Sequence, residues 1–218
     1  DVNCAPTADL VEAGTHPVLR NRLYGGDVAT VVAAARAAAE GLLAGGVLPV
    51  VKHIPGYGRA RVDSHLELPR VSAPLAELEA RDFAPFRALA DLPMGMTAHI
   101  VVEAVDADRP ATTSPAMMGV IRDRIGFGGL IMSDDIGMQA LSGTLAERAA
   151  ATLAAGVDIV LQCSGDAADM AAVAGAVGPM TSGAVRRADA ALAWRRAPWD
   201  ADLAAVAAEL ADLLRDAA

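Results

Sequence analysis

Four polar residues around one glycine-rich turn are the side chains best suited to chemistry in this sequence. Lys52 and His53 follow the apolar run VLPVV, and Asp63 and His65 come after the turn PGYG. An imidazole transfers protons near neutral pH, a carboxylate beside it orients the ring, and an ammonium group holds polar ligands. The group therefore predicts a binding or catalytic site. The alternative is a strand end with satisfied polar groups, in which Asp63 caps a turn.

Further polar residues stand at the ends of other apolar runs. His99 lies near the end of MGMTAHIV, and Asp134 and Asp135 end GGLIMSDD. The carboxyl ends of parallel strands meet at one edge of a sheet, so these residues are expected to gather near Lys52 and His53. Asp134 could instead cap the following helix, although Asp135 is the better candidate for that cap.

The elements that position these residues alternate between short β-rich runs and longer alanine-rich stretches, which is typical of βαβ units. Strands are expected over residues 2–8, 47–53, 94–101, 128–134 and 157–163. Helices are expected over residues 27–44, 74–90, 114–125, 144–155, 166–176, 181–195 and 200–216. No linker interrupts the pattern, so residues 1–218 are expected to form one α/β domain.

Polar residues at the ends of three successive strands favour a TIM-type (β/α) barrel over an open doubly wound sheet. A closed barrel has about eight strands in about 250 residues, so roughly three βα units, including the first strands, are expected to precede Asp1. No G-x-G-x-x-G or Walker sequence is present, which gives nucleotide binding little support.

Composition limits the possible partners. The 218 residues are 54% hydrophobic and 21% charged, and no apolar run is long enough to span a membrane. The net charge of −9 and the absence of a basic cluster argue against a nucleic acid partner. Cys4 and Cys163 lie in apolar runs, which favours packing over a disulfide or a metal site and agrees with a cytoplasmic location.

The longest motif resembles a known family signature. KHIPGYGRARVDSHLELP is similar to KH[FI]PGHG followed by DSH and LP, which marks bacterial β-N-acetylhexosaminidases of glycoside hydrolase family 3. Three more blocks occur in the family's order, namely NCAPTADL with HPVLRNRLYGGD, then MTAHIV, then GFGGLIMSDDIGMQAL. The resemblance implies an exo-acting, retaining β-N-acetylglucosaminidase that removes terminal non-reducing sugars and needs no metal or organic cofactor.

The resemblance also implies roles for individual residues. Asp134 corresponds to the catalytic nucleophile, which forms a covalent glycosyl-aspartate. His65 corresponds to the general acid/base, with Asp63 as the partner of its imidazole. From the residues alone, His65 could also be a surface histidine in a loop.

Arg22, Lys52 and His53 correspond to residues that bind the sugar hydroxyls, and the implied substrates are muropeptides from peptidoglycan recycling in the cytoplasm. Structural alternatives are a pair between Arg22 and Asp27 and the neutralisation of a buried aspartate by Lys52. Asp9 and His16 belong to matched blocks and are expected to hold the loop after the first strand.

The sequence departs from the family pattern at two places. Tyr57 replaces the histidine of PGHG, which is expected to alter loop packing more than the reaction. The family's early block, DQEGG followed by an arginine, has no match, so the sequence by itself also fits a non-catalytic truncated barrel. A third possibility is a metal-dependent barrel hydrolase, with Lys52, His53, His99 and Asp134 as the ligands.

Overall fold

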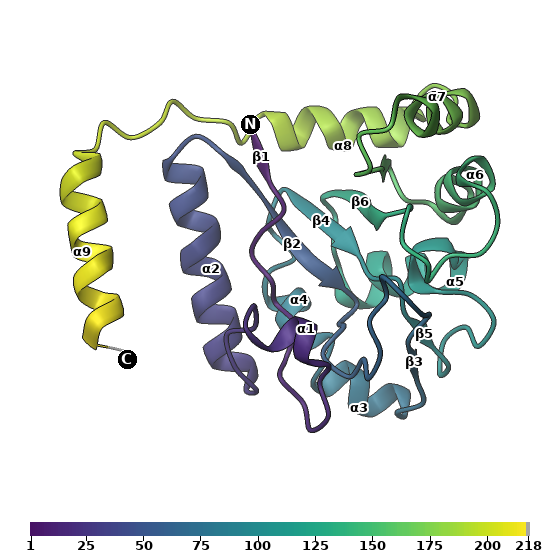
Figure 1. Cartoon of the computed structure of the whole chain (residues 1–218), viewed down its shortest axis with the longest axis horizontal. Coiled ribbons are helices and arrows are strands. Elements are labelled where there is room, and N and C mark those ends of the chain that lie inside the picture. The colour runs from purple at the N-terminus through teal and green to yellow at the C-terminus, as the bar shows by residue number, and fades with distance from the viewer. Residues whose placement is uncertain (217–218) are drawn as a thin grey trace.

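The computed structural model describes residues 1–216 and is built around one parallel sheet (Figure 1). The sheet has the order β1-β2-β4-β6-β7, and every neighbouring pair is parallel. Its strands are β1 (Val2–Asn3), β2 (Leu48–Ile54), β4 (Met94–Thr97), β6 (Leu130–Asp135) and β7 (Ile159–Leu161). Each lies within or overlaps an expected strand, so the predicted parallel α/β architecture is confirmed.

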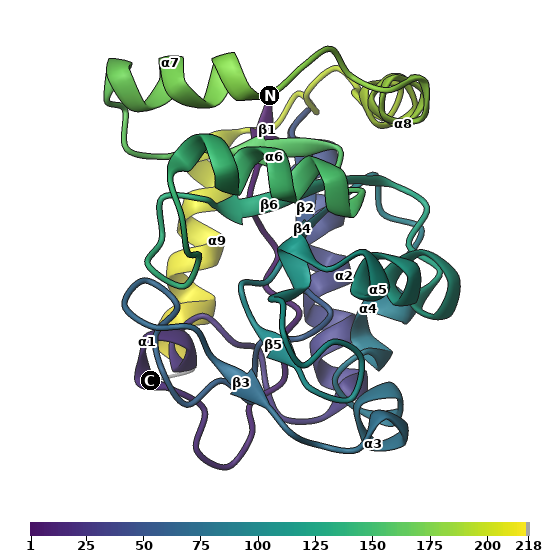
Figure 2. The ribbon, with the colours of Figure 1, turned by 90° about the vertical axis from the view of Figure 1, so that its right-hand side faces the viewer.

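The sheet is curled, as in a section of a barrel. Cys4, next to the edge strand β1, packs in the same apolar cluster as Ile159 and Leu161 of the opposite edge strand β7. Figures 1 and 2 show the strands wrapping around this cluster rather than lying in one plane. The described strands therefore form an open part of a (β/α) barrel.

Side chains that point alternately to the two faces of the sheet form two separate apolar layers. Val50 and Met132 belong to a cluster on the concave face of the sheet, whereas Val51 and Ile131 point into the larger core on the other face. Successive side chains of a strand point to opposite faces, so strands buried on both sides are almost continuously apolar. Lys52 breaks this rule at the concave face, close to the carboxyl end of β2.

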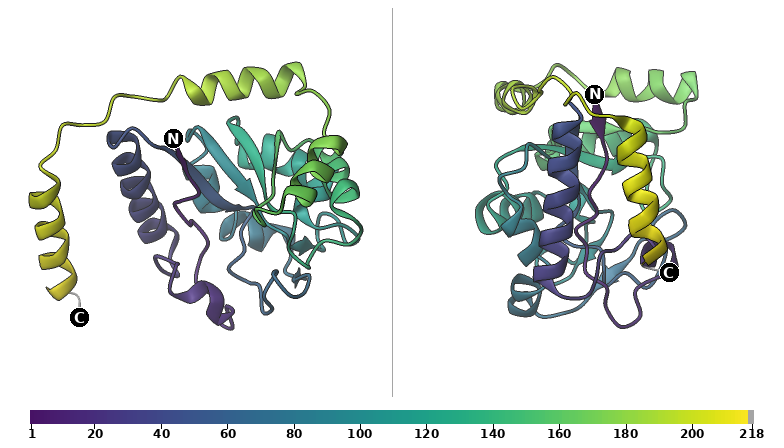
Figure 3. Two further views of the ribbon diagram at one scale, coloured as in Figure 1. Left: turned by 45° about the horizontal axis from the view of Figure 1, so that its top comes forward. Right: turned by 90° about the vertical axis from the view of Figure 1, so that its left-hand side faces the viewer.

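The α-helices of the described residues are α1 (Pro17–Arg20), α2 (Val28–Ala44), α3 (Leu75–Ala80), α4 (Ala84–Ala88), α5 (Pro115–Gly119), α6 (Leu145–Ala155), α7 (Ala167–Ala176), α8 (Ser182–Leu192) and α9 (Leu203–Asp216). Helices α2, α4 and α5 pack against the convex face of the sheet (Figures 1 and 2), whereas α8 places Ala188 and Ala191 in the cluster of the concave face. A 3-10 turn spans Ala111–Thr113, and a π-helix spans Val120–Ile125. Helix α9 stands apart from the other elements (Figure 3), and residues 203–215 are exposed. None of the helices among residues 1–216 has both the length and the apolar character needed to cross a membrane.

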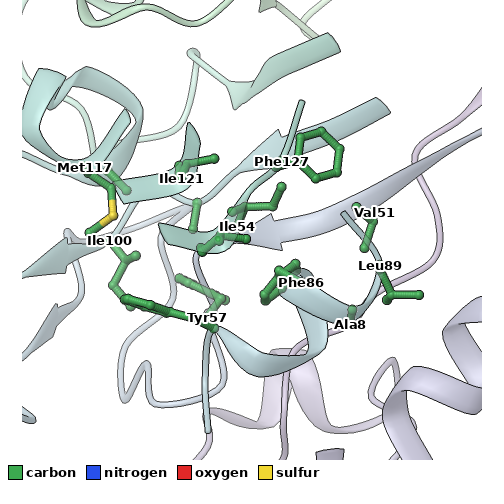
Figure 4. Close-up of a cluster of buried hydrophobic side chains, with 14 of the residues drawn as sticks. Ala8, Val51, Ile54, Tyr57, Phe86, Leu89, Ile100, Met117, Ile121 and Phe127 are labelled. Atoms are coloured by element: carbon green, nitrogen blue, oxygen red, sulfur yellow. The ribbon is translucent and has the colours of Figure 1, made fainter. Parts of the chain in front are cut away.

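The larger core lies between the sheet and helices α2, α4 and α5. Its fully buried side chains include Phe83, Phe86 and Phe127, together with Ile54 from β2. Figure 4 shows this cluster and places Tyr57 within it, directly after the carboxyl end of β2. The glycine-rich turn is therefore attached directly to the larger core.

For three elements the predicted residue range was wrong. The helix expected over 74–90 is broken at Arg81–Phe83, because Asp82 turns inward and accepts from Arg59 Nε at 2.9 Å. The strand expected over 94–101 divides into β4 and β5 (Val101–Val102), and β5 pairs with β3 (Arg70–Val71) in a separate two-stranded sheet, seen in Figure 2. The strand expected over 2–8 is regular only at Val2–Asn3, with one further bridge from Thr7 to Lys52.

Two smaller expectations also fail. Asp135 does not cap a helix, since α6 begins ten residues later with Thr144 as its N-cap and Glu147 completing a capping box. Both cysteines are free thiols, as expected, but Cys163 is exposed rather than packed. Cys4 is half-buried. Asp135 is the last residue of β6 and Cys163 lies two residues after β7, so both differences arise where the chain leaves the sheet.

Candidate active site

One cavity at the carboxyl ends of the strands brings together the six residues to which the family resemblance assigns catalysis or sugar binding. It has a volume of about 80 Å³. Its lining consists of Val18, Arg22, Lys52, His53, Tyr57, Asp63, Ser64, His65, Asp134 and Met138. These side chains come from α1, β2, the loop after β2, and the end of β6. The cavity therefore collects a carboxylate, an imidazole–carboxylate pair and two cations in one place.

His53 is held rigidly by a buried carboxylate. Asp9 is fully buried, and its Oδ2 lies 2.7 Å from His53 Nδ1. The backbone amides of His53 and Tyr57 also donate to the Asp9 carboxylate, at 3.2 and 2.6 Å. With Nδ1 bound to Asp9, the ring directs Nε2 toward Asp134, 3.9 Å from its Oδ2. Asp9 thus sets both the orientation of His53 and the start of the glycine-rich turn.

Asp134 is the last residue but one of β6, and its carboxylate lies half-buried in the cavity. Burial is the largest single influence and would raise the pKa of this carboxyl, but the combined effects of the His53 and His99 imidazoles, the Asp135 amide and Lys52 outweigh it. The net effect lowers the pKa of Asp134 below its ordinary value, so the carboxylate is ionised at neutral pH. Oδ1 accepts from the amide of Asp135 at 2.9 Å, which fixes the side chain against its own strand. An ionised, rigid carboxylate is what a nucleophile requires.

Asp63 and His65 form a hydrogen-bonded pair at the mouth of the cavity. Asp63 Oδ1 lies 2.7 Å from His65 Nδ1 and accepts from the His65 amide at 2.9 Å. Partial burial would raise the pKa of Asp63, but these two contacts with His65 lower it below its ordinary value. The His65 side chain is 61% exposed, so its Nε2 side is open to an incoming ligand. This arrangement suits a group that exchanges protons with ligand and water.

Close backbone packing explains the glycine-rich turn that connects the two parts of the site. A Cβ atom on Gly58 would lie 1.8 Å from the carbonyl oxygen of Leu10, so only glycine fits there. The carbonyl of Gly58 accepts from the buried Thr15 hydroxyl at 2.7 Å. His16 caps α1, and its amide donates to the carbonyl of Ala60 at 3.0 Å. The loop after β1 therefore supports the loop after β2.

Comparison with known proteins agrees with this architecture. Residues 1–194 match the Glycosyl hydrolase family 3 N terminal domain. The chain belongs to glycoside hydrolase family 3. The resemblance that its motifs suggest is thereby confirmed at the level of the family.

Named family 3 relatives extend the comparison. A β-hexosaminidase of Tolumonas auensis is 37% identical over 207 residues, covering 91% of this chain and 59% of the relative. A β-hexosaminidase of Alkalilimnicola ehrlichii is 41% identical over 169 residues, covering 75% of this chain and 48% of the relative. The chain thus spans about half the length of the curated relatives it matches.

Solved structures of this family share the fold. The family 3 β-N-acetylglucosaminidase from a Paenibacillus species superposes with a TM-score of 0.79 at 30% identity, covering 89% of this chain and 39% of that one. Native NagZ from Neisseria gonorrhoeae gives a TM-score of 0.77 at 36% identity, covering 87% of this chain and 56% of that one. This family 3 chain is therefore similar to known glycosidases in both sequence and architecture.

The two cations of the cavity differ in how firmly they are held. Lys52 lies within β2 and is half-buried, whereas Arg22 follows α1 and is exposed. The pair of Arg22 with Asp27 that the sequence left open does not form, because Asp27 caps α2 and accepts from the Thr30 amide at 2.9 Å. Both cations border the cavity and face the region of Asp134.

His99 stands behind the site rather than in it. The ring is buried, its Nε2 donates to the carbonyl of Asp135 at 2.9 Å, and its Nδ1 lies 2.8 Å from the Thr112 hydroxyl. Both nitrogens are therefore engaged, which leaves no lone pair for a metal. Among residues 1–216 no group of three or more His, Cys, Asp or Glu side chains is arranged to hold a metal ion. The geometry gives the metal-ligand interpretation of His99 no support.

The buried ring of His99 predicts a dependence of stability on pH. Burial lowers the pKa of His99 below its ordinary value, so the folded protein favours the neutral ring, whereas the unfolded chain takes up a proton near pH 6.5. The free energy of unfolding is therefore expected to fall as the pH drops below about 6.5, by up to about 1.4 kcal/mol per pH unit from this group.

Urea unfolding between pH 8 and pH 5 measures this effect of His99. His99→Gln is expected to remove that part of the pH dependence, and His65→Gln, at an exposed ring, serves as the matched control. An unchanged pH dependence in His99→Gln would rule out the buried neutral ring as the cause.

Sequence reasoning underestimated two residues. Asp9 was expected only to hold a loop, but its carboxylate also orients His53. Tyr57 was expected to affect loop packing, and its hydroxyl accepts from the Ser64 amide at 2.9 Å, next to Asp63 and His65. Both contacts join residues that local spacing does not connect, since Asp9 and His53 are 44 positions apart.

Proposed function

We propose that this chain hydrolyses terminal non-reducing β-N-acetylhexosamine residues by double displacement. One observation carries the proposal, namely the gathering of the ionised Asp134 carboxylate and the Asp63–His65 pair in a single cavity. A retaining glycosidase needs one nucleophile and one group that first donates and then accepts a proton. Asp134 is suited to the first role by its fixed carboxylate, and His65 to the second by its open position at the mouth.

The two steps follow from these positions. In the first step an Asp134 carboxylate oxygen forms a bond to the anomeric carbon, the glycosidic C–O bond breaks, and His65 protonates the leaving oxygen. In the second step His65 takes a proton from water, the water oxygen attacks the anomeric carbon, and the bond to Asp134 breaks. Asp63 orients the imidazole in both steps and offsets the charge of its protonated form.

The sugar is held by the polar residues opposite His65. Lys52 and Arg22 border the cavity as hydrogen-bond donors, and His53 presents Nε2 beside Asp134. Hydroxyl groups next to the anomeric carbon can accept from these donors while Asp134 reaches the carbon itself. Because Asp9 holds His53 in place, the strand end of β2 supplies a rigid support for the sugar ring.

The names of the relatives support N-acetylhexosamine as the sugar. Family members similar to this chain carry the names β-hexosaminidase and β-N-acetylglucosaminidase. We extend the proposal to muropeptide fragments from peptidoglycan recycling in the cytoplasm, with residues 1–218 acting within a single catalytic domain. Growth of a strain lacking the gene, with measurement of accumulated muropeptides, tests this extension.

The stereochemistry of the product tests the proposed reaction directly. The chain is incubated with 4-nitrophenyl β-N-acetylglucosaminide, and the anomeric proton of the released sugar is followed by NMR. Double displacement predicts that the β-anomer appears first and the α-anomer only through later mutarotation. Initial formation of the α-anomer would exclude a covalent intermediate, and a chain that releases no nitrophenol would contradict the proposed activity.

Replacing His65 by alanine is expected to slow the reaction according to the leaving group. The loss in kcat/KM should reach about 10²–10⁴-fold for a sugar or alkyl leaving group, which needs a proton, and be much smaller for dinitrophenolate. Rates with a series of aryl and alkyl β-N-acetylglucosaminides measure this effect. Leu66→Ala, at the exposed neighbouring residue, is the control for disturbance of the loop. An equal loss for every leaving group would argue against an acid role for His65.

A further inference from the structure

The segment that carries Asp63 and His65 is attached to the rest of the protein at Ser64, between the two residues. The amide of Ser64 donates to the Tyr57 hydroxyl at 2.9 Å. The carbonyl of Ser64 accepts from the amide of Ala140 at 3.1 Å, in the segment that follows β6. Ser64 is itself buried, although His65 is exposed. The proton-transfer pair at the mouth of the cavity is therefore fixed through a buried residue between its members.

Tyr57 is well placed to act as the fixed partner in this attachment. Its side chain is only 5% exposed and belongs to the larger core cluster, as Figure 4 shows. Its backbone amide donates to Asp9 at 2.6 Å, and its ring packs beside that of His53 with 5.7 Å between the centroids. Tyr57 thus connects the rigid end of β2 with the segment that carries His65.

The Tyr57 hydroxyl has the chemistry that this contact needs. Burial raises the pKa of the phenol, which more than offsets the opposite effect of the contact with Ser64, so the hydroxyl is protonated at neutral pH. It can therefore accept from the Ser64 amide and also donate to the carbonyl of Val62, 3.4 Å away. The Tyr57 hydroxyl thus contacts the backbone of Val62 and of Ser64, the residues on either side of Asp63.

We propose that Tyr57 is a positioning residue whose hydroxyl holds the Asp63–Ser64–His65 segment so that His65 faces the Asp134 cavity. The inference rests on the proposed function, since it assigns to Tyr57 the placement of the acid/base group. Tyr57 stands where the signature of the related β-N-acetylhexosaminidases has histidine. The phenol is thus a feature of this chain that the shared motif does not specify.

Amide hydrogen exchange tests the attachment without any substrate. In the unchanged chain, the Ser64 amide is expected to exchange far more slowly than an unstructured amide. In Tyr57→Phe, which removes only the hydroxyl, exchange at Ser64 should become about tenfold faster, since one buried hydrogen bond is lost. Tyr24→Phe, which changes the other and more exposed tyrosine, is the matched control and should leave Ser64 unaffected. Random-coil exchange at Ser64 in the unchanged chain, or equal exchange in Tyr57→Phe, would overturn the inference.

Leaving-group dependence separates a positioning role from a purely structural one. Tyr57→Phe is expected to lower kcat/KM about tenfold for a poor leaving group, which needs the proton from His65, and less than about twofold for dinitrophenolate. A uniform loss, or none, would contradict the role assigned to Tyr57. If Asp134 and His65 prove dispensable while exchange at Ser64 responds to Tyr57→Phe, the proposed function fails and the attachment of the segment stands.

Discussion

Replacing Asp134 by alanine is expected to abolish the release of nitrophenol from 4-nitrophenyl β-N-acetylglucosaminide, with a loss in kcat on the order of 10³-fold or more. The variant removes the only carboxylate of β6 that lines the cavity, and with it the atom that would bond to the anomeric carbon. His53 loses the charge beside its Nε2 but keeps its contact with Asp9, so the rest of the site remains in place. Burst kinetics and mass spectrometry of the trapped glycosyl-enzyme measure the effect.

Two further variants identify the feature of Asp134 that matters. Asp134→Asn keeps the size of the side chain and removes the charge, so it should be almost as inactive as the alanine variant. Asp135→Asn is the matched control, because Asp135 lies one residue away, and its Oδ1 accepts from the amides of Gly137 and Cys163 at 2.9 and 3.2 Å. We expect that control to lose far less activity. Full activity in Asp134→Ala, or a larger loss in Asp135→Asn, would refute the assignment of the nucleophile.

Replacing Asp9 by alanine is expected to cause the largest loss of stability among the residues around the site. The change leaves two buried backbone amides, those of His53 and Tyr57, and the His53 ring without their acceptor. Removing one partner of a buried, hydrogen-bonded charged group costs about 3–5 kcal/mol, and a loss of that size is expected in the free energy of unfolding. Denaturation in guanidinium chloride measures this loss.

A variant of a second aspartate distinguishes the loss of stability caused by removing a buried carboxylate from the loss caused by removing an exposed helix cap. Asp166→Ala removes the N-cap of α7, where the carboxylate accepts from the amides of Ala168 and Asp169 in an exposed position. A cap of this kind contributes about 1 kcal/mol, so the loss should be several times smaller than for Asp9. Asp9→Asn is expected to lie between the two, since the amide retains one acceptor oxygen. Equal losses for Asp9→Ala and Asp166→Ala would show that burial of the Asp9 carboxylate adds nothing.

Strand periodicity made much of the site predictable. Lys52 and Asp134 each end an apolar run, and parallel strands necessarily bring their carboxyl ends to one edge. The sequence also predicted the pair of Asp63 and His65, because two residues separated by one position in a turn can share a hydrogen bond. These features depend on local spacing and on the direction of the strands, and both are visible in one sequence.

Contacts between distant segments could not be predicted in the same way. The continuous helix expected over residues 74–90 is broken because Asp82 pairs with Arg59, which lies on a different loop. The strand-like run 94–101 changes direction after Thr97, and β5 then pairs with β3 instead of extending the main sheet. In both cases a tertiary partner changed what local propensity favoured.

By itself, the sequence determined which chemical groups this protein places at the strand ends, and its motifs identified the family. The tertiary structure decided how those groups are held. Asp9 reaches His53 from the loop after β1, and Tyr57 reaches Ser64 across the glycine-rich turn. The physical reason is that local spacing determines the direction of a side chain within its own element, whereas the partner of a buried polar group depends on how separate elements pack.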